Sequence, residues 1–428
     1  MSTRRFTLAI WLIALAMNVG YVLAFDRVLE VESDAEGYDR GAVALWEGRG
    51  FPVSGEEGLE PKREPGMYVF LASVYSLFGH DVRMARIGQA VLASTFPLFA
   101  FAIARRLSDA GVLPAAAPRL AAALTVICPA FLFYTGVLMR ETLLTFLFLA
   151  SLLVLTGYVS QPRVRRLVLY GALVGLGALV DGRLMYFPVF FAGFWAVTQR
   201  SWRPAARFLV VAFVVALVVI SPWAIRNYVV LDRFVLLTSQ QYKGFWLATN
   251  PEGILEWDWD REPLRSFRDL PPEIRDQKIA DLAIENLRDH PVRYGGSAVV
   301  RFFRLWFSGS NSSVMPLMAR STAAAVEARD WGYVALKLSF VGLHYTFVLG
   351  GLAGLVLCVR RARLYPLMPL VAFPAYISVL HMILFATPRY HVPTLPILII
   401  FLSGLVTAVA EQGTVSRAWN ARAEVRVA

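Results

Sequence analysis

The stretch FTLAIWLIALAMNVGYVLAF, residues 6–25, contains no charged side chain. An α-helix needs about 20 mostly apolar residues to cross the roughly 30 Å of hydrocarbon in a bilayer. Arg4 and Arg5 stand directly before this stretch. The run is longer than the about 7–15 residues of a signal-peptide core, so we expect a first transmembrane helix that is retained.

Similar apolar runs recur along the chain, in which 57% of the 428 residues are hydrophobic. Repeated runs of this length are typical of polytopic helical membrane proteins. We therefore predict an all-α polytopic membrane protein with about ten transmembrane helices. Two of the predicted helices, 166–180 and 184–198, are short for a bilayer. The predicted spans are residues 6–25, 84–104, 119–138, 141–159, 166–180, 184–198, 206–224, 333–357, 364–385 and 392–410.

The placement of arginine predicts the orientation of these spans, and the whole chain has a net charge of +11. If the spans alternate in direction, the arginines beside them fall on one side of the membrane, which the positive-inside rule assigns to the cytoplasm. Both termini, including the tail 411–428, are then cytoplasmic, and the loops 26–83 and 225–332 face outside. The arginines on the cytoplasmic side are Arg4, Arg5, Arg105, Arg106, Arg163, Arg165, Arg166, Arg200, Arg203, Arg207, Arg360, Arg361 and Arg363.

Two further apolar stretches are predicted not to cross the membrane. Residues 66–79 are about two-thirds of a span, and residues 298–308 mix arginine with aromatic residues. If 66–79 crossed, the Arg105 and Arg106 pair would move outside. We expect both stretches to form helices that lie at, or re-enter, the outer surface. Residues 1–428 are then a single integral membrane domain.

Neither a nucleic-acid partner nor a cofactor is indicated by the sequence. Orientation explains the excess of arginine, and basic residues are not interleaved with aromatic ones in the manner of a nucleic-acid surface. Cys128 and Cys358 lie in apolar segments, so no disulfide framework is implied. The five histidines show no metal-ligand spacing. Asp258-Trp259-Asp260 is a short match to motifs that bind metal for cytoplasmic nucleotide sugars, but this loop is expected outside.

The acidic run Glu32-Ser33-Asp34-Ala35-Glu36-Gly37-Tyr38-Asp39 directly follows the first span. Helical spacing of the apolar residues after it predicts a short helix from Asp34 to Trp46. One turn separates Asp34 from Tyr38, so both lie on one face. Acids beside a membrane are costly to desolvate and often mark a working site, and an aspartate there can take a proton from an acceptor hydroxyl or amine. A solvated acidic loop explains the run equally well.

Several cations are expected on the same outer side, where the positive-inside rule disfavours them. Binding of a phosphate by guanidinium groups is one reason for such a placement, and snorkelling of single side chains to lipid headgroups is another. Glu141, at the start of the fourth span, either complements a helix N-terminus or faces a cavity. The outer cations are Lys62, Arg63, Arg183, Arg226 and Arg389.

These residues form a recognisable order of motifs. The first outer loop contains Asp34-x-x-x-Tyr38-Asp39, then Leu45-x-x-Gly48-Arg49-Gly50-Phe51, then Arg63-x-Pro65-Gly66-x-Tyr68. This order resembles the first outer loop of GT-C type integral membrane glycosyltransferases. The nearest groups are glycosyltransferase family 39 and its relatives, which include protein O-mannosyltransferases, aminoarabinose transferases and lipopolysaccharide galacturonosyl transferases. Pro222-Trp223-x-Ile225-Arg226 and Pro388-Arg389-Tyr390 are similar to later landmarks of these enzymes.

The resemblance implies a GT-C-like helical bundle with juxtamembrane helices on its outer face. It also implies a polyprenyl-phosphate sugar donor and inverting transfer of the sugar to a lipid, glycan or protein acceptor. Asp34 would be the catalytic base, and the outer arginines would hold the donor phosphate. Lys62 and Arg63 are alternatives for a phosphate-binding lysine of some relatives, and Glu64-Pro65 departs from the two prolines common in the family. The expected location is the bacterial inner membrane, with the active site on the periplasmic side.

Two other functions compete with sugar transfer. A transporter or flippase of lipid-linked sugars would place charged residues near the membrane midplane, whereas the candidates here cluster at one face. A membrane scaffold without catalysis is the other alternative. A cavity that joins Asp34 to Arg226 or Arg389 would favour transfer, and a continuous path across the membrane would favour transport.

Overall fold

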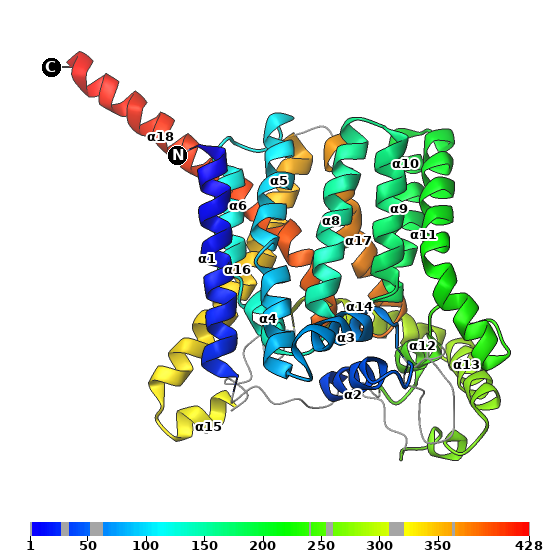
Figure 1. Ribbon diagram of the computed structural model, residues 1–428. Coiled ribbons are helices and arrows are strands. Elements are labelled where there is room, and N and C mark those ends of the chain that lie inside the picture. Colours follow the sequence, from blue (N-terminus) through cyan, green and yellow to red (C-terminus); the bar gives the residue numbers. More distant parts are fainter. Residues whose placement is uncertain are drawn as a thin grey trace.

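The computed structural model describes residues 2–26, 34–51, 63–238, 241–253, 260–307, 321–361 and 364–427. Within these ranges the chain forms helices and no strands. Long helices stand side by side in a bundle, and shorter helices lie across one end of it (Figure 1). The predicted all-α class is therefore confirmed.

Seven helical segments among the described residues are long and apolar enough to cross a membrane. The predicted count of about ten is not confirmed on this criterion, because α9 (Val164–Ala178) and α10 (Phe187–Gln199) are shorter. Both nevertheless stand within the bundle, α9 against α8 and α11, and α10 against α11 and α17 (Figure 1). The seven segments are α1 (Thr3–Phe25), α4 with α5 (Val82–Ala93 and Phe96–Asp109), α8 (Glu141–Ser160), α11 (Trp202–Leu231), α16 (Trp331–Arg361), α17 (Leu364–Ile383), and η4 with α18 (Pro388–Thr394 and Leu395–Val427).

One further pair of helices is apolar and long enough to cross a membrane only when its two members are taken together. Helix α6 (Ala117–Val126) and helix α7 (Pro129–Gly136) meet at 41°. Pro129 occupies the first turn of α7, where its missing N–H does no harm. The residue before it, Cys128, is held in an extended conformation, as the proline ring requires, so α6 cannot continue into α7.

Glycines allow two pairs of long helices to approach closely. On α9, a Cβ added at Gly171 or Gly175 would lie 2.7 Å or 2.9 Å from a backbone carbonyl oxygen of α11. Gly351 on α16 meets the Leu398 carbonyl of α18 in the same way, at 2.6 Å. Helices in lipid associate largely through such close packing. These contacts fix the pairs α9–α11 and α16–α18.

The short helices confirm several sequence predictions. Helix α2 covers Asp34–Trp46 as expected, and the apolar stretch near residue 70 forms α3 (Gly66–Phe78). Both lie across the end of the bundle where α14 also lies, and α14 includes most of the stretch 298–308 (Figure 1). The remaining short helices are α12 (Gln241–Thr249), α13 (Pro272–Asp289), α14 (Pro291–Phe307) and α15 (Thr322–Glu327).

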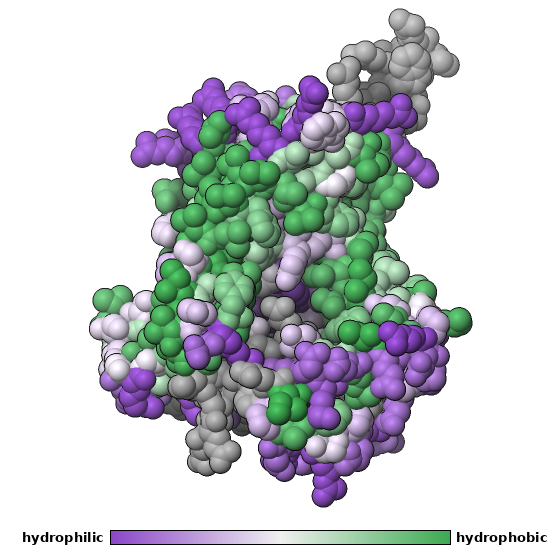
Figure 2. All heavy atoms as spheres, turned by 90° about the vertical axis from the view of Figure 1, so that its right-hand side faces the viewer, coloured by the Kyte–Doolittle hydropathy of each residue, from purple (hydrophilic) through white to green (hydrophobic). Residues whose placement is uncertain are grey.

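The surface divides into three zones. On the face shown in Figure 2, apolar residues cover the middle of the bundle and hydrophilic residues gather at both ends. The N-terminus lies at the end opposite to α2 and α3, where α5, α8 and α10 end and where α9 and α11 begin (Figure 1). Many of the arginines that the sequence assigns to the cytoplasm lie at these helix ends: Arg105, Arg106, Arg163, Arg165, Arg166, Arg200, Arg203 and Arg207. The protein is thus a multi-pass membrane protein whose short helices lie opposite to its arginine-rich end.

Candidate active site

A cavity of about 1060 Å³ opens at the end of the bundle that carries the short helices. Its walls come from α2, the segment before α3, the turn between α9 and α10, helices α12 and α14, the end of α17, and η4. Charged side chains from segments far apart in the sequence meet in it. They are Asp34, Arg63, Glu64, Arg140, Asp181, Arg183, Lys243, Arg304 and Arg389.

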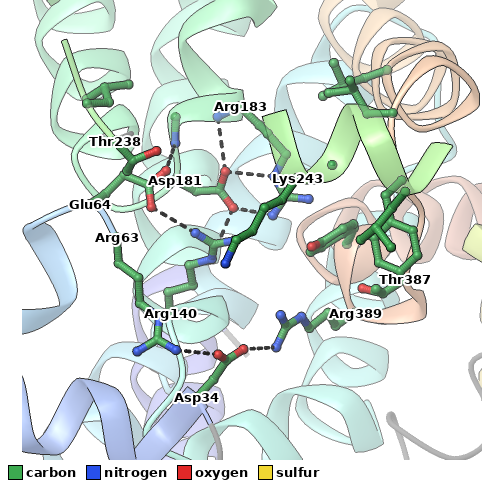
Figure 3. Close-up of a pocket in the computed structure, with 18 of the residues that line it drawn as sticks. Asp34, Arg63, Glu64, Arg140, Asp181, Arg183, Thr238, Lys243, Thr387 and Arg389 are labelled. Atoms are coloured by element: carbon green, nitrogen blue, oxygen red, sulfur yellow. Dashed lines mark hydrogen bonds and ion pairs between the residues drawn. The ribbon is translucent and has the colours of Figure 1, made fainter. Parts of the chain in front are cut away.

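Asp34 lies between two arginines (Figure 3), and we call these three residues the Asp34 clasp. Arg63 Nη2 donates to Asp34 Oδ1 at 2.5 Å, and Arg389 Nη1 donates to Asp34 Oδ2 at 3.0 Å. Burial raises the pKa of Asp34, but the charges and hydrogen bonds of Arg389 and Arg63 outweigh it and hold the pKa below its usual value. Asp34 is therefore an anion at neutral pH.

Arg63 is held by residues of the first outer loop. Its guanidinium lies over the ring of Tyr38, 4.9 Å from the centroid, and the side chain of Tyr68 lies close to it. Gly37 makes room for it, because a Cβ at this position would collide with the guanidinium. Helix α2 therefore supplies Asp34, the Tyr38 ring that contacts the Arg63 guanidinium, and the space at Gly37 that this guanidinium occupies.

Arg389 is held from behind by Glu141, the first residue of α8. Arg389 Nε lies 3.7 Å from Glu141 Oε1. The Glu141 side chain is buried, and its Oε2 has no hydrogen-bond partner among the described residues. Glu141 does not line the cavity. Its charge is directed at Arg389, so it serves to position that arginine.

A second group of charges lies deeper, and we call it the Asp181 cluster: Glu64, Arg140, Asp181 and Arg183 (Figure 3). Arg140 joins the two acids, with Nη1 at 3.0 Å from Glu64 Oε2 and Nε at 3.3 Å from Asp181 Oδ2. Arg183 Nε donates to Asp181 Oδ1 at 2.8 Å. Burial raises the pKa of Asp181, but Arg140 and Arg183 outweigh it and lower the pKa far below its usual value.

Glu64 differs from Asp181 although Arg140 contacts both. Burial raises the pKa of Glu64, and the neighbouring Asp181 charge adds to this effect, while Arg140 opposes it. Oε1 of Glu64 accepts a hydrogen bond from the Gly182 N–H at 2.9 Å. Each carboxylate in the cluster therefore accepts from both a side chain and the backbone, since Asp181 also accepts from the Arg183 N–H at 3.1 Å.

Close docking of two backbone segments builds this cluster. The Gly66 N–H donates to the Leu179 carbonyl at 2.6 Å. A Cβ at Gly66 would lie 2.7 Å from that same carbonyl oxygen and 2.6 Å from Val180 Cγ2. The start of α3 can therefore reach the end of α9 only because residue 66 is glycine. This contact brings Glu64 against the turn that carries Asp181.

The opposite wall is formed by α12, α14 and the end of α17. Lys243 on α12 extends into the cavity (Figure 3), and Arg304 on α14 lines it. Buried Arg301 ties these elements together. It donates to the Ala248 carbonyl of α12 at 2.8 Å and, through Nε, to the Met382 carbonyl of α17 at 3.0 Å.

The structure brings most of the sequence candidates together. Asp34, Tyr38, Arg63, Arg183 and Arg389 all line the cavity, and Glu141 lies behind Arg389. Arg226 is not among the lining residues. Helix α11 continues past the predicted end at residue 224 to Leu231, and the Arg226 guanidinium lies 5.1 Å from the ring centroid of Trp223. Lys62 lies outside the described residues.

Five charged lining residues were not selected from the sequence: Glu64, Arg140, Asp181, Lys243 and Arg304. Arg140 and Asp181 stand at the ends of apolar segments on the predicted outer side, which is the same signal that selected Arg183 and Arg389. Applied evenly, that signal finds both of them. Among the described residues, no group of three or more His, Cys, Asp or Glu side chains is placed to hold a metal ion.

Comparisons with known proteins agree with this architecture. Residues 61–225 match the profile of the dolichyl-phosphate-mannose-protein mannosyltransferase family. The oligosaccharyltransferase AglB from Archaeoglobus fulgidus, in complex with an inhibitory peptide and a dolichol-phosphate, aligns with a TM-score of 0.56 and 15% identity over 98% of this chain and 52% of its own. The same enzyme tethered to an acceptor peptide aligns with a TM-score of 0.55 and 14% identity over 97% and 51%.

A weaker likeness is to ArnT from Cupriavidus metallidurans bound to undecaprenyl phosphate, with a TM-score of 0.43 and 16% identity over 95% of this chain and 77% of that one. No curated protein matches the chain. The chain spans about half the length of the AglB structures it matches. The AglB likeness shows that this chain has the GT-C fold.

Proposed function

Because the chain has the GT-C fold, we propose that it transfers a sugar from a polyprenyl-phosphate donor to an acceptor bound in the cavity. One observation carries this proposal. A carboxylate and two arginines meet in a cavity of about 1060 Å³ at the rim of an apolar bundle. The AglB structure with an inhibitory peptide also contains a dolichol-phosphate, which is a polyprenyl phosphate like the lipid part of the proposed donor. Residues 1–428 would form one catalytic domain.

The arginines would bind the donor phosphate. A polyprenyl chain can lie along the apolar surface of the bundle while its phosphate reaches the cavity. When the bond between the anomeric carbon and the phosphate oxygen breaks, its electron pair goes to the phosphate, so negative charge grows there. Guanidinium groups stabilise that charge where it develops. Arg63 and Arg389 stand at the cavity surface for this role, and Glu141 positions Arg389.

Asp34 would act on the acceptor. The acceptor oxygen or nitrogen attacks the anomeric carbon on the side opposite to the phosphate, and Asp34 takes the proton that the acceptor loses. One displacement of this kind inverts the anomeric configuration and needs no second carboxylate as nucleophile. The products are the glycosylated acceptor and the polyprenyl phosphate.

The cavity favours transfer over transport. Its charged residues belong to the end of the bundle that carries α2, α3 and α12, whereas transporters bind their substrates near the midplane. The cavity joins Asp34 to Arg389, which is the arrangement that transfer requires. By the positive-inside rule this end faces the periplasm of a bacterial inner membrane, with both termini in the cytoplasm.

A transfer assay with purified protein in lipid nanodiscs tests the proposal. Undecaprenyl-phosphate sugars would be offered with a lipid extract, and glycosylated products would be detected by mass spectrometry. We expect Asp34→Asn to lower transfer by about 10²–10⁴-fold, the usual contribution of a general base.

Asp39→Asn is the matched control, because Asp39 lies on the same helix but hydrogen-bonds Tyr75 and His80, away from the cavity. It should leave transfer unchanged. Transfer by Asp34→Asn at the wild-type rate would remove Asp34 from the reaction. Labelling of Trp46→Cys by a membrane-impermeant maleimide, added to intact cells, would test the side of the membrane.

A further inference from the structure

The two oxygens of Asp34 are each engaged by a different guanidinium. Arg63 contacts Oδ1 and Arg389 contacts Oδ2. A base accepts a proton on such an oxygen, and a phosphate would bind the same N–H groups that Asp34 now accepts from. The carboxylate and a phosphate therefore have the same binding partners in this cavity.

The two arginines have supports that do not depend on Asp34. Arg63 rests on the Tyr38 ring and occupies the space left by Gly37, and Arg389 is paired with Glu141. Asp34 has fewer supports. Within the described part of the chain, its carboxylate accepts side-chain hydrogen bonds from these two arginines alone, and 36% of the side chain is exposed. If the carboxylate moves away, the arginines keep their places.

We propose that the donor phosphate displaces the Asp34 carboxylate from Arg63 and Arg389, and that this displacement frees Asp34 to act as the base. This inference rests on the proposed function. It makes the reaction ordered, because the donor must bind before Asp34 can accept the proton of the acceptor. A bound acceptor without a donor would meet a carboxylate whose oxygens are already engaged.

Charge and proton balance support the exchange. A polyprenyl-phosphate sugar is a phosphodiester with one negative charge, so it replaces the single charge of Asp34 beside the arginines. Away from the arginines, Asp34 loses the interactions that lower its pKa, and it becomes a better base. After transfer Asp34 carries the proton of the acceptor. When the product phosphate leaves and Asp34 returns to the arginines, they favour its ionised form and the proton passes to water.

Binding of farnesyl phosphate, measured by calorimetry in detergent, tests the competition. Removal of the Asp34 charge removes the competitor, so Asp34→Asn should bind farnesyl phosphate more tightly than the wild type, by at least about fivefold, the lower end of usual coupling between sites. Asp34→Glu keeps a carboxylate and should bind no more tightly than the wild type. Asp39→Asn should also match the wild type.

The outcomes separate this inference from the function on which it rests. Arg389→Ala should bind farnesyl phosphate at least about tenfold more weakly, as expected from loss of a charge-assisted contact. If Asp34→Asn binds no more tightly than the wild type while Arg389→Ala binds more weakly, the displacement is wrong and the phosphate site stands. If neither variant changes the affinity, or the wild type does not bind, the phosphate site itself is wrong. Thermal unfolding of each variant identifies any that does not fold, and Asp34→Ser then replaces Asp34→Asn.

Discussion

The Asp34 clasp and the Asp181 cluster use the same two residue types in different ways. The Asp34 side chain is 36% exposed and connects two arginines through its carboxylate alone. The Asp181 side chain is 3% exposed, and its cluster contains two acids, two arginines and two backbone N–H donors. A buried, multiply bonded group of charges is costly to disrupt, whereas a half-exposed one can exchange its partners. We therefore assign the cluster to the fold and the clasp to the reaction.

The largest effect should come from Asp181→Asn. This change leaves Arg140 and Arg183, which are 17% and 20% exposed, with one carboxylate fewer, and loss of one partner of a buried ion pair typically costs about 3–5 kcal/mol. Thermal unfolding in detergent would measure it. Asp34→Asn should stay within about 1 kcal/mol of the wild type, as expected for a more exposed pair. Equal losses of stability in the two variants would erase the distinction between clasp and cluster.

A smaller loss is expected from Gly66→Ala. The added methyl group meets the Leu179 carbonyl and Val180, and neither can move far, so overpacking should cost about 1–3 kcal/mol. Gly193→Ala on α10 is the control, because a Cβ there has no neighbour within 4 Å. If Gly66→Ala is as stable as this control, the docking of α3 on the end of α9 does not hold the Asp181 cluster in place.

Glu141→Gln should affect the clasp without affecting the cluster. Arg389 would lose the charge that holds it from behind, and an interaction with a charged group is worth about 1.5 kcal/mol at the lower end. A loss of about 1.5 kcal/mol corresponds to a roughly tenfold rise in the donor KM, and we expect kcat to change less. A fall in kcat at unchanged donor KM would instead place Glu141 in the chemical step.

The mildest effect concerns pH. The active form of Asp34 is ionised, so activity is lost as pH falls through its pKa. In the free protein that pKa lies below the usual 3.8, and kcat/KM should therefore hold constant from pH 7.5 down to pH 5. Since kcat reports the donor complex, in which the arginines are displaced from Asp34, its acid limb should lie at higher pH. If the acid limbs of kcat and kcat/KM fall at the same pH, Asp34 keeps its contacts with Arg63 and Arg389 during the reaction, and the displacement is wrong.

Local patterns predicted much of this architecture. The apolar runs predicted the helical bundle, and the spacing of Tyr38, Ala42 and Leu45 predicted α2 with its observed ends. Asp34 and Arg389 were selected from the sequence because charged residues are unexpected on the predicted outer side, and both line the cavity. These signals are carried by neighbouring residues, so one sequence is enough to read them.

Contacts between distant segments could not be predicted in this way. The Asp181 cluster joins residues 64, 140 and 181, which no local period connects. The position of Arg226 was missed for a similar reason, since the continuation of α11 to Leu231 and the packing of Arg226 on Trp223 depend on neighbouring elements. Helices α9 and α10 are too short to be counted as spans by length; packing against α11 keeps both in the bundle.

Arg301 connects α12 and α17 in one wall of the cavity. Among the described residues, no carboxylate forms an ion pair with it. Its acceptors include the Ala248 and Met382 carbonyl oxygens in the last turns of α12 and α17, where the aligned peptide dipoles leave partial negative charge, and Ser297 Oγ on α14. Such acceptors cannot be neutralised by protons. Acid that protonates carboxylates elsewhere in the site should therefore leave the Arg301 hydrogen bonds intact. The contact between α12 and α17 through Arg301 should then persist even when the carboxylates of the cavity are protonated.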